Sequence, residues 1–190
     1  MGTKDFNPFD LLICRLRARV VRRALPYGSR VLDFGCGHQA LFLRSVQDVI
    51  QHGVGIDYDA DPGRIGDNLE IRQSAFRDRL DFPDESFDSV TILAVLEHIP
   101  LDQVDVLFQE FRRVLRPDGQ VLLTTPTPLA KPVLEFLAFR LKVISGPEIA
   151  DHRHYYSRGD LQLLAGRHDF TLAAFQRFLL GFNCYAMLQK

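Results

Sequence analysis

The sequence predicts an α/β fold: a doubly wound, mostly parallel sheet with helices on both faces and an antiparallel last strand. Two observations carry this prediction. Short aliphatic runs alternate with segments of helical periodicity through the first two thirds of the chain. An apolar, aromatic-rich tail follows Phe170 and turns at Gly181, which predicts a closing pair of strands. We expect all 190 residues to form a single domain.

The expected elements follow one another closely along the chain. Apolar residues at helical spacing predict a helix over 9–25, which Pro26 ends. Runs of aliphatic residues predict strands at 30–34, 53–56, 69–73, 88–93 and 120–125. Helical spacing predicts two more helices, at 40–50 and 101–115. The second of these stops at the Arg-Pro-Asp-Gly sequence of 116–119, whose proline and glycine favour a turn.

Composition narrows the class of protein. With 46% hydrophobic and 25% charged residues, the chain is neither disordered nor fibrous. A net charge of −1 gives no general attraction to nucleic acid, so we expect no nucleic-acid partner. The three cysteines match neither a zinc-binding spacing nor a disulfide framework, and the N-terminus lacks the apolar core of a signal peptide. Because no run of about 18 apolar residues is present either, we expect a cytoplasmic protein.

The strongest functional signal is the run Val-Leu-Asp-Phe-Gly-Cys-Gly at 31–37. It predicts a buried parallel strand and a tight turn in which Gly35 and Gly37 let a ligand approach the backbone. Asp57 follows Gly37 by 20 residues, where an acidic residue can bind a ribose. On spacing alone, a nicotinamide-dependent oxidoreductase also fits this turn. Asp33 argues against it, because a carboxylate inside the loop suits a polar or amino group better than a pyrophosphate.

Further motifs follow the turn. They are Gly-Ile-Asp-Tyr-Asp (55–59), Phe-Pro-Asp-Glu-Ser-Phe-Asp (82–88), Leu-Glu-His-Ile-Pro (96–100) and Val-Leu-Arg-Pro-Asp-Gly-Gln-Val-Leu-Leu-Thr-Thr-Pro (114–126). In order and spacing, the motifs resemble those of the class I S-adenosylmethionine-dependent methyltransferases, of the type that acts on small molecules. The resemblance implies a Rossmann-like methyltransferase fold, S-adenosylmethionine as the cofactor, and methyl transfer to oxygen or nitrogen of a small-molecule acceptor. Lipid-linked and glycan intermediates are the favoured acceptors. A methyltransferase-like module that binds the cofactor without turnover is the alternative, and an NAD-dependent oxidoreductase is less well supported.

The resemblance also implies which residues hold the cofactor. Asp33 and the backbone of 35–37 would face its methionine part. Asp57 would accept hydrogen bonds from both ribose hydroxyls, and Tyr58 would lie against the adenine. The full set of expected cofactor-binding residues is Asp33, Gly35, Cys36, Gly37, Asp57, Tyr58, Phe76 and Ala94.

Three positions depart from the family's pattern. Gln39 stands where a third glycine is common. Ser-Ala-Phe at 74–76 replaces an acidic residue that commonly binds the adenine amino group, which leaves backbone groups and stacking to hold the adenine. Some quinone-type O-methyltransferases of the family use an acidic residue three positions before Glu97 to help hold a metal ion. Ala94 stands there in this chain, so we expect no metal.

Histidines are the candidates for catalysis. Methyl transfer from a sulfonium is an in-line displacement, which needs a general base only when the acceptor is a hydroxyl or a protonated amine. The resemblance places His98 beside the transferred methyl; the alternative is a structural histidine that ends the fourth strand. His152 and His154 are further candidates, because histidines two apart share a face of an extended segment. Their alternative role is to satisfy backbone groups of a loop.

An apolar insertion follows the fifth expected strand, over 129–144. It combines apolar and basic residues, namely Phe136, Leu137, Phe139 and Leu141 with Lys131, Arg140 and Lys142. A lid helix packed on the core would explain it; our hypothesis is that it covers a pocket for a lipophilic acceptor. The helix over 9–25 carries five arginines, which form either a solvated face or a contact with an anionic membrane surface or an acidic ligand: Arg15, Arg17, Arg19, Arg22 and Arg23. The expected organisation is an N-terminal helical segment (1–27), a cofactor-binding core (28–128), a lid on the acceptor side (129–157), and a closing helix with strands (158–190).

Overall fold

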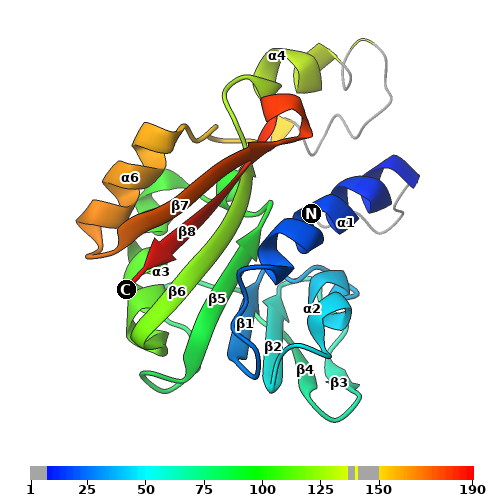
Figure 1. Ribbon diagram of the computed structural model, residues 1–190, viewed down its shortest axis with the longest axis vertical. Coiled ribbons are helices and arrows are strands. Elements are labelled where there is room, and N and C mark those ends of the chain that lie inside the picture. The colour runs from blue at the N-terminus through cyan, green and yellow to red at the C-terminus, as the bar shows by residue number, and fades with distance from the viewer. Residues whose placement is uncertain (1–7, 137–139, 141–149) are drawn as a thin grey trace.

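The fold is built around one eight-stranded sheet. The computed structural model describes residues 8–136, 140 and 150–190 of the chain. Along the sheet the strands follow the order β3-β4-β2-β1-β5-β6-β8-β7 (Figure 1). Their bounds are β1 (Arg30–Phe34), β2 (His52–Asp57), β3 (Gly63–Ile65), β4 (Leu69–Gln73), β5 (Phe87–Leu93), β6 (Leu115–Pro126), β7 (Thr171–Phe178) and β8 (Asn183–Gln189).

Most neighbouring strands run parallel. The five strands β4, β2, β1, β5 and β6 form a parallel block. β8 lies antiparallel between β6 and β7, and β3 pairs antiparallel with the free edge of β4. The predicted doubly wound, mostly parallel sheet with an antiparallel last strand is therefore confirmed, as is the closing strand pair around Gly181.

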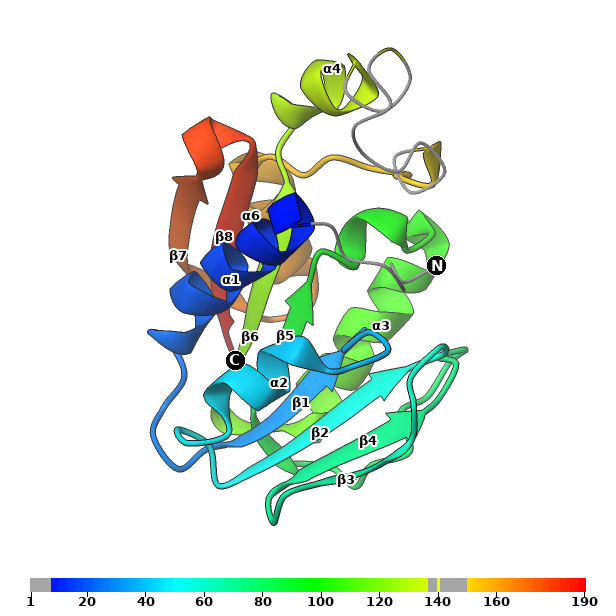
Figure 2. The same ribbon diagram turned by 90° about the vertical axis from the view of Figure 1, so that its right-hand side faces the viewer.

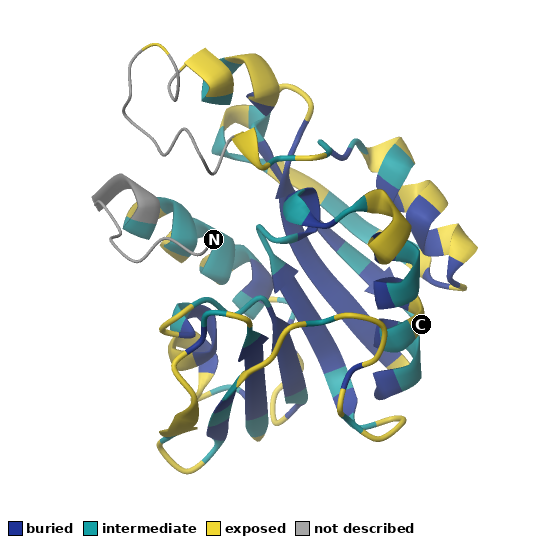
Figure 3. Ribbon diagram, turned by 180° about the vertical axis from the view of Figure 1, so that it is seen from behind, coloured by how far each residue is buried: buried dark blue, intermediate teal, exposed yellow. Residues whose placement is uncertain are grey.

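Helices cover both faces of the sheet, as Figures 1 and 2 show. They are α1 (Pro8–Arg22), α2 (Leu41–Val46), α3 (Leu101–Val114), α4 (Ala130–Glu135) and α6 (Arg158–Arg167), with the short 3₁₀ helices η1 (Leu96–His98) and η3 (Leu179–Gly181). Apolar side chains of α1 and α2 share one core with Val31 of β1, and those of α3 and α6 share the other with Leu32. Both β1 residues are fully buried, because successive side chains of a strand point to opposite faces. A strand covered on both sides requires an unbroken apolar run, which made the central strands recognisable in the sequence (Figure 3).

The structure differs from the sequence predictions mainly at element boundaries. β1 and β4 have their expected bounds, whereas the helix expected at 40–50 contains only α2. The turn expected at 116–119 lies inside β6, where Asp118 has a φ of 63° and the pairing with β5 shifts register. It is therefore a bulge within the strand rather than a link before it. The three-residue strand β3 was not expected, because so short a segment carries no period.

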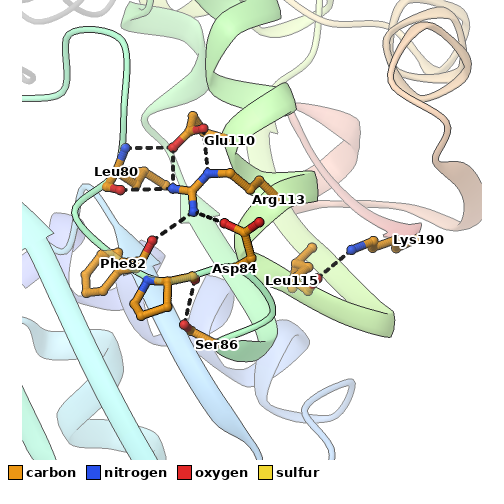
Figure 4. A network of polar contacts seen from close by, with 9 residues as sticks. Leu80, Phe82, Asp84, Ser86, Glu110, Arg113, Leu115 and Lys190 are labelled. Atoms are coloured by element: carbon orange, nitrogen blue, oxygen red, sulfur yellow. Dashed lines mark hydrogen bonds and ion pairs between the residues drawn. The ribbon is translucent and has the colours of Figure 1, made fainter.

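The connection from β4 to β5, residues 74–86, contains no helix and is held by Arg113 of α3 (Figure 4). The guanidinium donates to the carbonyl oxygens of Leu80 and Phe82 and to the carboxylates of Asp84 and Glu110, at 2.6–3.0 Å. These hydrogen bonds, with the two negative charges, raise the pKa of Arg113 above its ordinary value. Five donors in a planar fork allow one arginine to bind several oxygens at once. The segment is thereby fixed at the N-terminal side of β5.

The insertion after β6 is described only in part. α4 follows directly on β6, and Leu129 and Phe136 at its two ends are 56% and 54% exposed. Leu137, Phe139, Leu141 and Lys142 lie outside the described residues, so a lid over 129–144 stays a prediction. Within the described parts of the chain, no helix has the length and apolar character needed to cross a membrane.

Candidate functional site

The expected cofactor residues gather where neighbouring parallel strands end. Asp33 lies near the end of β1, Asp57 ends β2 and Ala94 follows β5; these three strands are adjacent in the sheet. The chain connections turn to opposite sides of the sheet between β1 and β5. Ligands of doubly wound sheets bind in the crevice that such a reversal creates. This edge of the sheet is therefore the candidate cofactor site.

The turn after β1 has the backbone that its glycines predict. Gly35 and Gly37 have φ values of 74° and 70°, in the left-handed region. A Cβ on Gly35 would lie 2.4 Å from Cγ2 of Val95, so a larger residue would collide there. A Cβ on Gly37 would have no described atom within 4 Å. The turn is tied to β2 through the amides of Gly35 and Cys36, which both donate to the carbonyl oxygen of Ile56, and it leaves open space above Gly37.

Asp57 holds the turn from the neighbouring strand. Its Oδ2 accepts from the amide of Gly37 and its Oδ1 from the amide of Asp59, both at 3.0 Å. A carboxylate offers about four acceptor positions, so two backbone bonds leave one further position on each oxygen. The side chain thus combines support of the loop with remaining capacity for hydroxyl donors.

Asp33 is a carboxyl group inside the protein. It is 2% exposed, and the hydroxyl of Thr91 on β5 donates to its Oδ1 at 2.6 Å. This bond spans β1 and β5, the two strands between which the connections reverse. Burial raises the pKa of Asp33 to about 7, with a smaller contribution from the charge of Asp57, while the Thr91 bond opposes the rise. Near neutral pH the group is therefore divided between its two protonation states.

Three more expected cofactor residues surround this crevice. Tyr58 follows Asp57 and is 51% exposed. Phe76 packs edge-on against Phe34, with 5.8 Å between ring centroids. Ala94 has a φ of 57°, unusual for a residue with a Cβ, and its amide donates to the carbonyl oxygen of Thr124 at 2.8 Å. Backbone strain of this kind is found preferentially at functional sites.

The backbone at Gln39 and Ala40 explains why the turn does not need the glycine that is common at position 39. Gln39 is exposed and has no positive φ, whereas the buried Ala40 takes the left-handed conformation with a φ of 48°. A glycine is therefore not required at position 39.

Cys36 is partly buried, and burial together with the charges of Asp33 and Asp57 raises the pKa of its thiol, which stays protonated at neutral pH.

The histidines expected on the catalytic side fall into two groups. His98 in η1 and His152 in the segment before α6 face each other, with 4.8 Å between ring centroids. Nδ1 of His152 lies 3.1 Å from the hydroxyl of Tyr155. The ring of His154 packs on Tyr156 instead, with centroids 4.6 Å apart. The structure therefore brings two of the three histidines together.

Glu97 is a functional candidate that the sequence analysis did not select. It is 1% exposed, and the hydroxyl of Thr125 donates to its Oε2 at 3.1 Å. Burial raises the pKa of Glu97, while His98 and Arg17 oppose the rise. Arg17 belongs to the arginine-rich α1, but it points inward and donates to Oδ1 of Asn183 at 3.3 Å. The Leu-Glu-His motif contains Glu97, yet nothing in that motif indicates that the carboxylate is buried.

Glu97, His98 and His152 together form what we call the Glu-His-His cluster. Each side chain offers one nitrogen or oxygen, and these atoms all lie within 4.8 Å of one another. Nδ1 of His98 is 3.2 Å from Oδ2 of Asp151 but lacks the alignment of a hydrogen bond, so this buried nitrogen has no hydrogen-bond partner among the described residues. The cluster begins three residues after Ala94, and the intervening Val95 lies against Gly35 of the turn.

The fold and the crevice define an α/β protein that binds a nucleoside cofactor at the strand ends. Residues 9–174 match the methyltransferase domain family, so the chain belongs to this family. The resemblance of its motifs to the class I S-adenosylmethionine-dependent methyltransferase family is thereby confirmed.

Curated relatives share about a third of their aligned residues with this chain. It is similar to the ubiquinone biosynthesis O-methyltransferase of Pseudomonas syringae pv. tomato, with 34% identity over 133 residues, 64% of this chain and 52% of that protein. It is also similar to the 27-O-demethylrifamycin SV methyltransferase of Amycolatopsis mediterranei, with 35% identity over 109 residues, 50% of this chain and 38% of that protein. The chain spans about half the length of the curated relatives it matches.

Solved structures confirm the fold. An S-adenosylmethionine-dependent methyltransferase from Mesorhizobium loti superimposes with a TM-score of 0.69 at 17% identity, over 92% of this chain and 98% of that one. The 1,6-didemethyltoxoflavin-N1-methyltransferase of Burkholderia thailandensis, solved with 1,6-didemethyltoxoflavin and S-adenosylhomocysteine, gives a TM-score of 0.67 at 19% identity, over 93% of this chain and 77% of that one. At these identities the likeness concerns the Rossmann-like methyltransferase fold.

Proposed function

We propose that the protein transfers the methyl group of S-adenosylmethionine to an oxygen atom of a small lipophilic acceptor. The observation that carries this proposal is the position of the Glu-His-His cluster, directly beside the cofactor crevice. The names of the two curated relatives above support oxygen as the accepting atom. Nitrogen is the second choice, because a protein of the same fold is named an N1-methyltransferase.

The crevice residues fit the proposed cofactor. Gly37 leaves room for a ligand against the backbone, and each oxygen of Asp57 keeps an acceptor position for a ribose hydroxyl. Asp33 in its ionised form would pair with the ammonium of the methionine part. Tyr58 and Phe76 offer aromatic faces for an adenine. When bound, S-adenosylmethionine supplies an electrophilic methyl group on a sulfonium.

The histidines provide the remaining chemistry. Burial and the charges of His98 and Arg17 lower the pKa of His152 to about 4, so its imidazole stays neutral and can accept a hydrogen bond or a proton from a hydroxyl. His98 lies in η1, which follows Ala94 after one residue, so His98 is nearer in sequence to the crevice residues than His152 is. In our proposal both imidazoles bind the acceptor hydroxyl and orient its oxygen for in-line attack.

Turnover with His98 replaced tests the proposal. Purified protein with isotopically labelled S-adenosylmethionine is expected to methylate members of a panel of catechols, phenols and hydroxyquinones, with products identified by mass spectrometry. His98→Ala is expected to lower kcat about 100-fold, the effect of losing one acid–base group, without changing cofactor affinity. His52→Ala, at the opposite end of β2, is the matched control with full turnover. Cofactor binding without product from any acceptor would favour the alternative of a binding module.

Exposed apolar side chains support a lipophilic acceptor. Leu180 of η3 is 94% exposed, and Leu129 and Phe136 flank α4. The two elements are adjacent, since a Cβ on Gly181 would lie 3.9 Å from Cδ1 of Leu129. We propose that this surface takes up acceptors with hydrocarbon chains, including lipid-linked intermediates.

The exposed arginines at the N-terminal helix support contact with an anionic membrane. Of the four arginines in α1, Arg22 pairs with Asp48 at 2.7 Å and Arg17 points inward. The other two, Arg15 and Arg19, are exposed and share one face of the helix with the exposed Leu12. The exposed Arg23 follows directly after the helix. A basic face with an apolar residue is typical of helices that lie on a charged membrane surface.

Vesicle binding tests the membrane contact. Wild-type protein is expected to co-sediment with vesicles rich in phosphatidylserine, and replacing Arg15, Arg19 and Arg23 by glutamate is expected to reduce the bound fraction at least about fivefold, because each basic residue near the surface contributes about 1 kcal/mol. Arg22→Glu with Asp48→Arg keeps the ion pair in reverse and serves as the control. Equal sedimentation of the wild type and the triple variant would refute the contact, and the protein would then be a freely dissolved cytoplasmic enzyme in our proposal.

A further inference from the structure

The two edges of the sheet are protected to different degrees. One edge is β3, with three residues, and the other is β7, with eight. An edge strand presents unpaired amide and carbonyl groups, and proteins commonly limit this by keeping the strand short or by placing charges or proline in it. β3 is short and carries the exposed Arg64. β7 is long and contains no proline, and Arg177 is its one charged residue.

The outer edge of β7 has no hydrogen-bond partner among the described residues. β7 is the last strand of the sheet and pairs antiparallel with β8 from Thr171 to Phe178 (Figure 1). No hydrogen bond between described residues joins β7 to an element other than β8. In an antiparallel pair about half of the amide and carbonyl groups point away from the partner strand. These groups of β7 are therefore open to a further strand.

The side chains of β7 suit an extension of the sheet. Leu172 and Phe175 pack on the core that includes residues of α3 and α6, and Ala174 and Phe178 pack on the core of the opposite face. The pairing with β8 shifts register once, between Leu172 and Ala174, and is regular from there to Phe178. A strand added beside β7 would continue both apolar layers. A long apolar edge of this kind favours pairing with another chain.

Two charged residues mark the ends of this edge. Over 169–178 the charged residues are Asp169, just before β7, and Arg177, near its end. Arg177 is exposed, and the Asp169 side chain is 80% exposed, with a contact of 3.6 Å to Arg112 of α3. Arg177 lies opposite Cys184, which belongs to the core on the α3 side, and residues opposite each other on paired strands point to the same face. The acid and the base therefore lie on one face of the sheet, at opposite ends of β7.

We propose that β7 is the interface at which two copies of this chain pair antiparallel and join their sheets into one. A two-fold axis perpendicular to the sheet keeps α6 of both copies on the same side. It also brings the start of each β7 to the end of the other, so that Asp169 of each copy approaches Arg177 of the second. A parallel arrangement would instead bring like charges together, so the charges favour the antiparallel one. The inference does not depend on the proposed function, since β7 contains none of the residues assigned to cofactor or acceptor.

Sedimentation velocity of the full-length protein at a series of micromolar concentrations tests the inference. The wild type is expected to sediment as a dimer that dissociates on dilution. Asp169→Arg and Arg177→Asp each place like charges at both ends of the interface, and each is expected to raise the dissociation constant at least about tenfold. The variant with both substitutions has the charges exchanged and is expected to return to within about threefold of the wild type. Arg64→Asp, at the opposite edge of the sheet, is the matched control with a wild-type dissociation constant.

Amide hydrogen exchange shows whether β7 itself forms the contact. A peptide covering 171–178 is expected to exchange more slowly at high protein concentration than after dilution, whereas one covering 63–65 exchanges equally in both. Thermal unfolding identifies a variant that has failed to fold. A monomeric wild type would overturn the inference, as would single variants that dimerise like the wild type. Exchange of β7 that does not depend on concentration, or a double variant no better than the single ones, would overturn it as well.

Discussion

Replacing Asp57 by alanine is expected to weaken S-adenosylmethionine binding at least about 100-fold, because hydrogen bonds to a charged acceptor are worth about 1.5–3 kcal/mol each and two ribose hydroxyls lose theirs. The substitution also removes the acceptors for the amides of Gly37 and Asp59, so the turn loses one of its ties to β2 and keeps those to Ile56. Asp57→Asn keeps one side-chain oxygen and is expected to fall between alanine and the wild type. Isothermal titration with S-adenosylmethionine and S-adenosylhomocysteine measures all three affinities.

The control for Asp57 is a neighbouring carboxylate with the same charge. Asp61→Ala removes an exposed side chain four residues further on and is expected to bind the cofactor as the wild type does. Thermal unfolding distinguishes loss of the ligand from loss of the fold. An Asp57→Ala protein that is folded and keeps an affinity within threefold of wild type would show that the ribose is held elsewhere.

The parts of the fold that were predictable are those with a local cause. β1 is buried on both faces over 31–34, whereas β4 alternates buried with partly exposed residues, and both patterns are typical of strands. The turn was predictable because Gly35 and Gly37 both have a positive φ, and at Gly35 a Cβ would also lie 2.4 Å from Val95. α2, shorter than expected, shows the limit of this reasoning. Helical periodicity continues past Val46, but the chain must turn there to enter β2.

The part of the site that was not predictable depends on contacts between distant segments. Arg17 resembles its exposed neighbours on α1 in sequence, and only the packing of α1 against β6 and β8 turns it inward. His152 and His154 are equivalent by spacing, yet one faces His98 and the other packs on Tyr156. Glu97 was visible within a motif, but its burial under the segment before α6 was not. Local sequence patterns therefore predicted the residues on the cofactor side of the site. They did not show which side chains come together on the acceptor side.

Asp33→Asn is expected to make the protein more stable at pH 8 while weakening its affinity for S-adenosylmethionine. The pKa of Asp33 is raised from 3.8 to about 7, chiefly by burial, so the unfolded chain loses this proton at a lower pH than the folded one. The free energy of unfolding therefore falls as the pH rises from 3.8 toward 7. At about 1.4 kcal/mol for each unit, the loss approaches 4 kcal/mol above pH 7. Asparagine stays neutral and keeps an oxygen for the hydroxyl of Thr91, so it avoids this loss.

The difference in unfolding free energy between Asp33→Asn and the wild type isolates this effect, because the other titrating groups cancel. Urea unfolding from pH 4 to pH 8 is expected to show the difference growing in favour of the variant and levelling off above pH 7. Thr91→Val removes the donor that opposes the rise in the pKa of Asp33, so its stability relative to the wild type is expected to fall as the pH rises, a change opposite in sign to that of Asp33→Asn. If this difference in unfolding free energy did not change with pH, or if the variant were less stable than the wild type at pH 8, burial of the ionised Asp33 would not destabilise the folded protein. A gain in stability joined to a loss of affinity would show that the carboxylate is kept for its ligand at the expense of the fold.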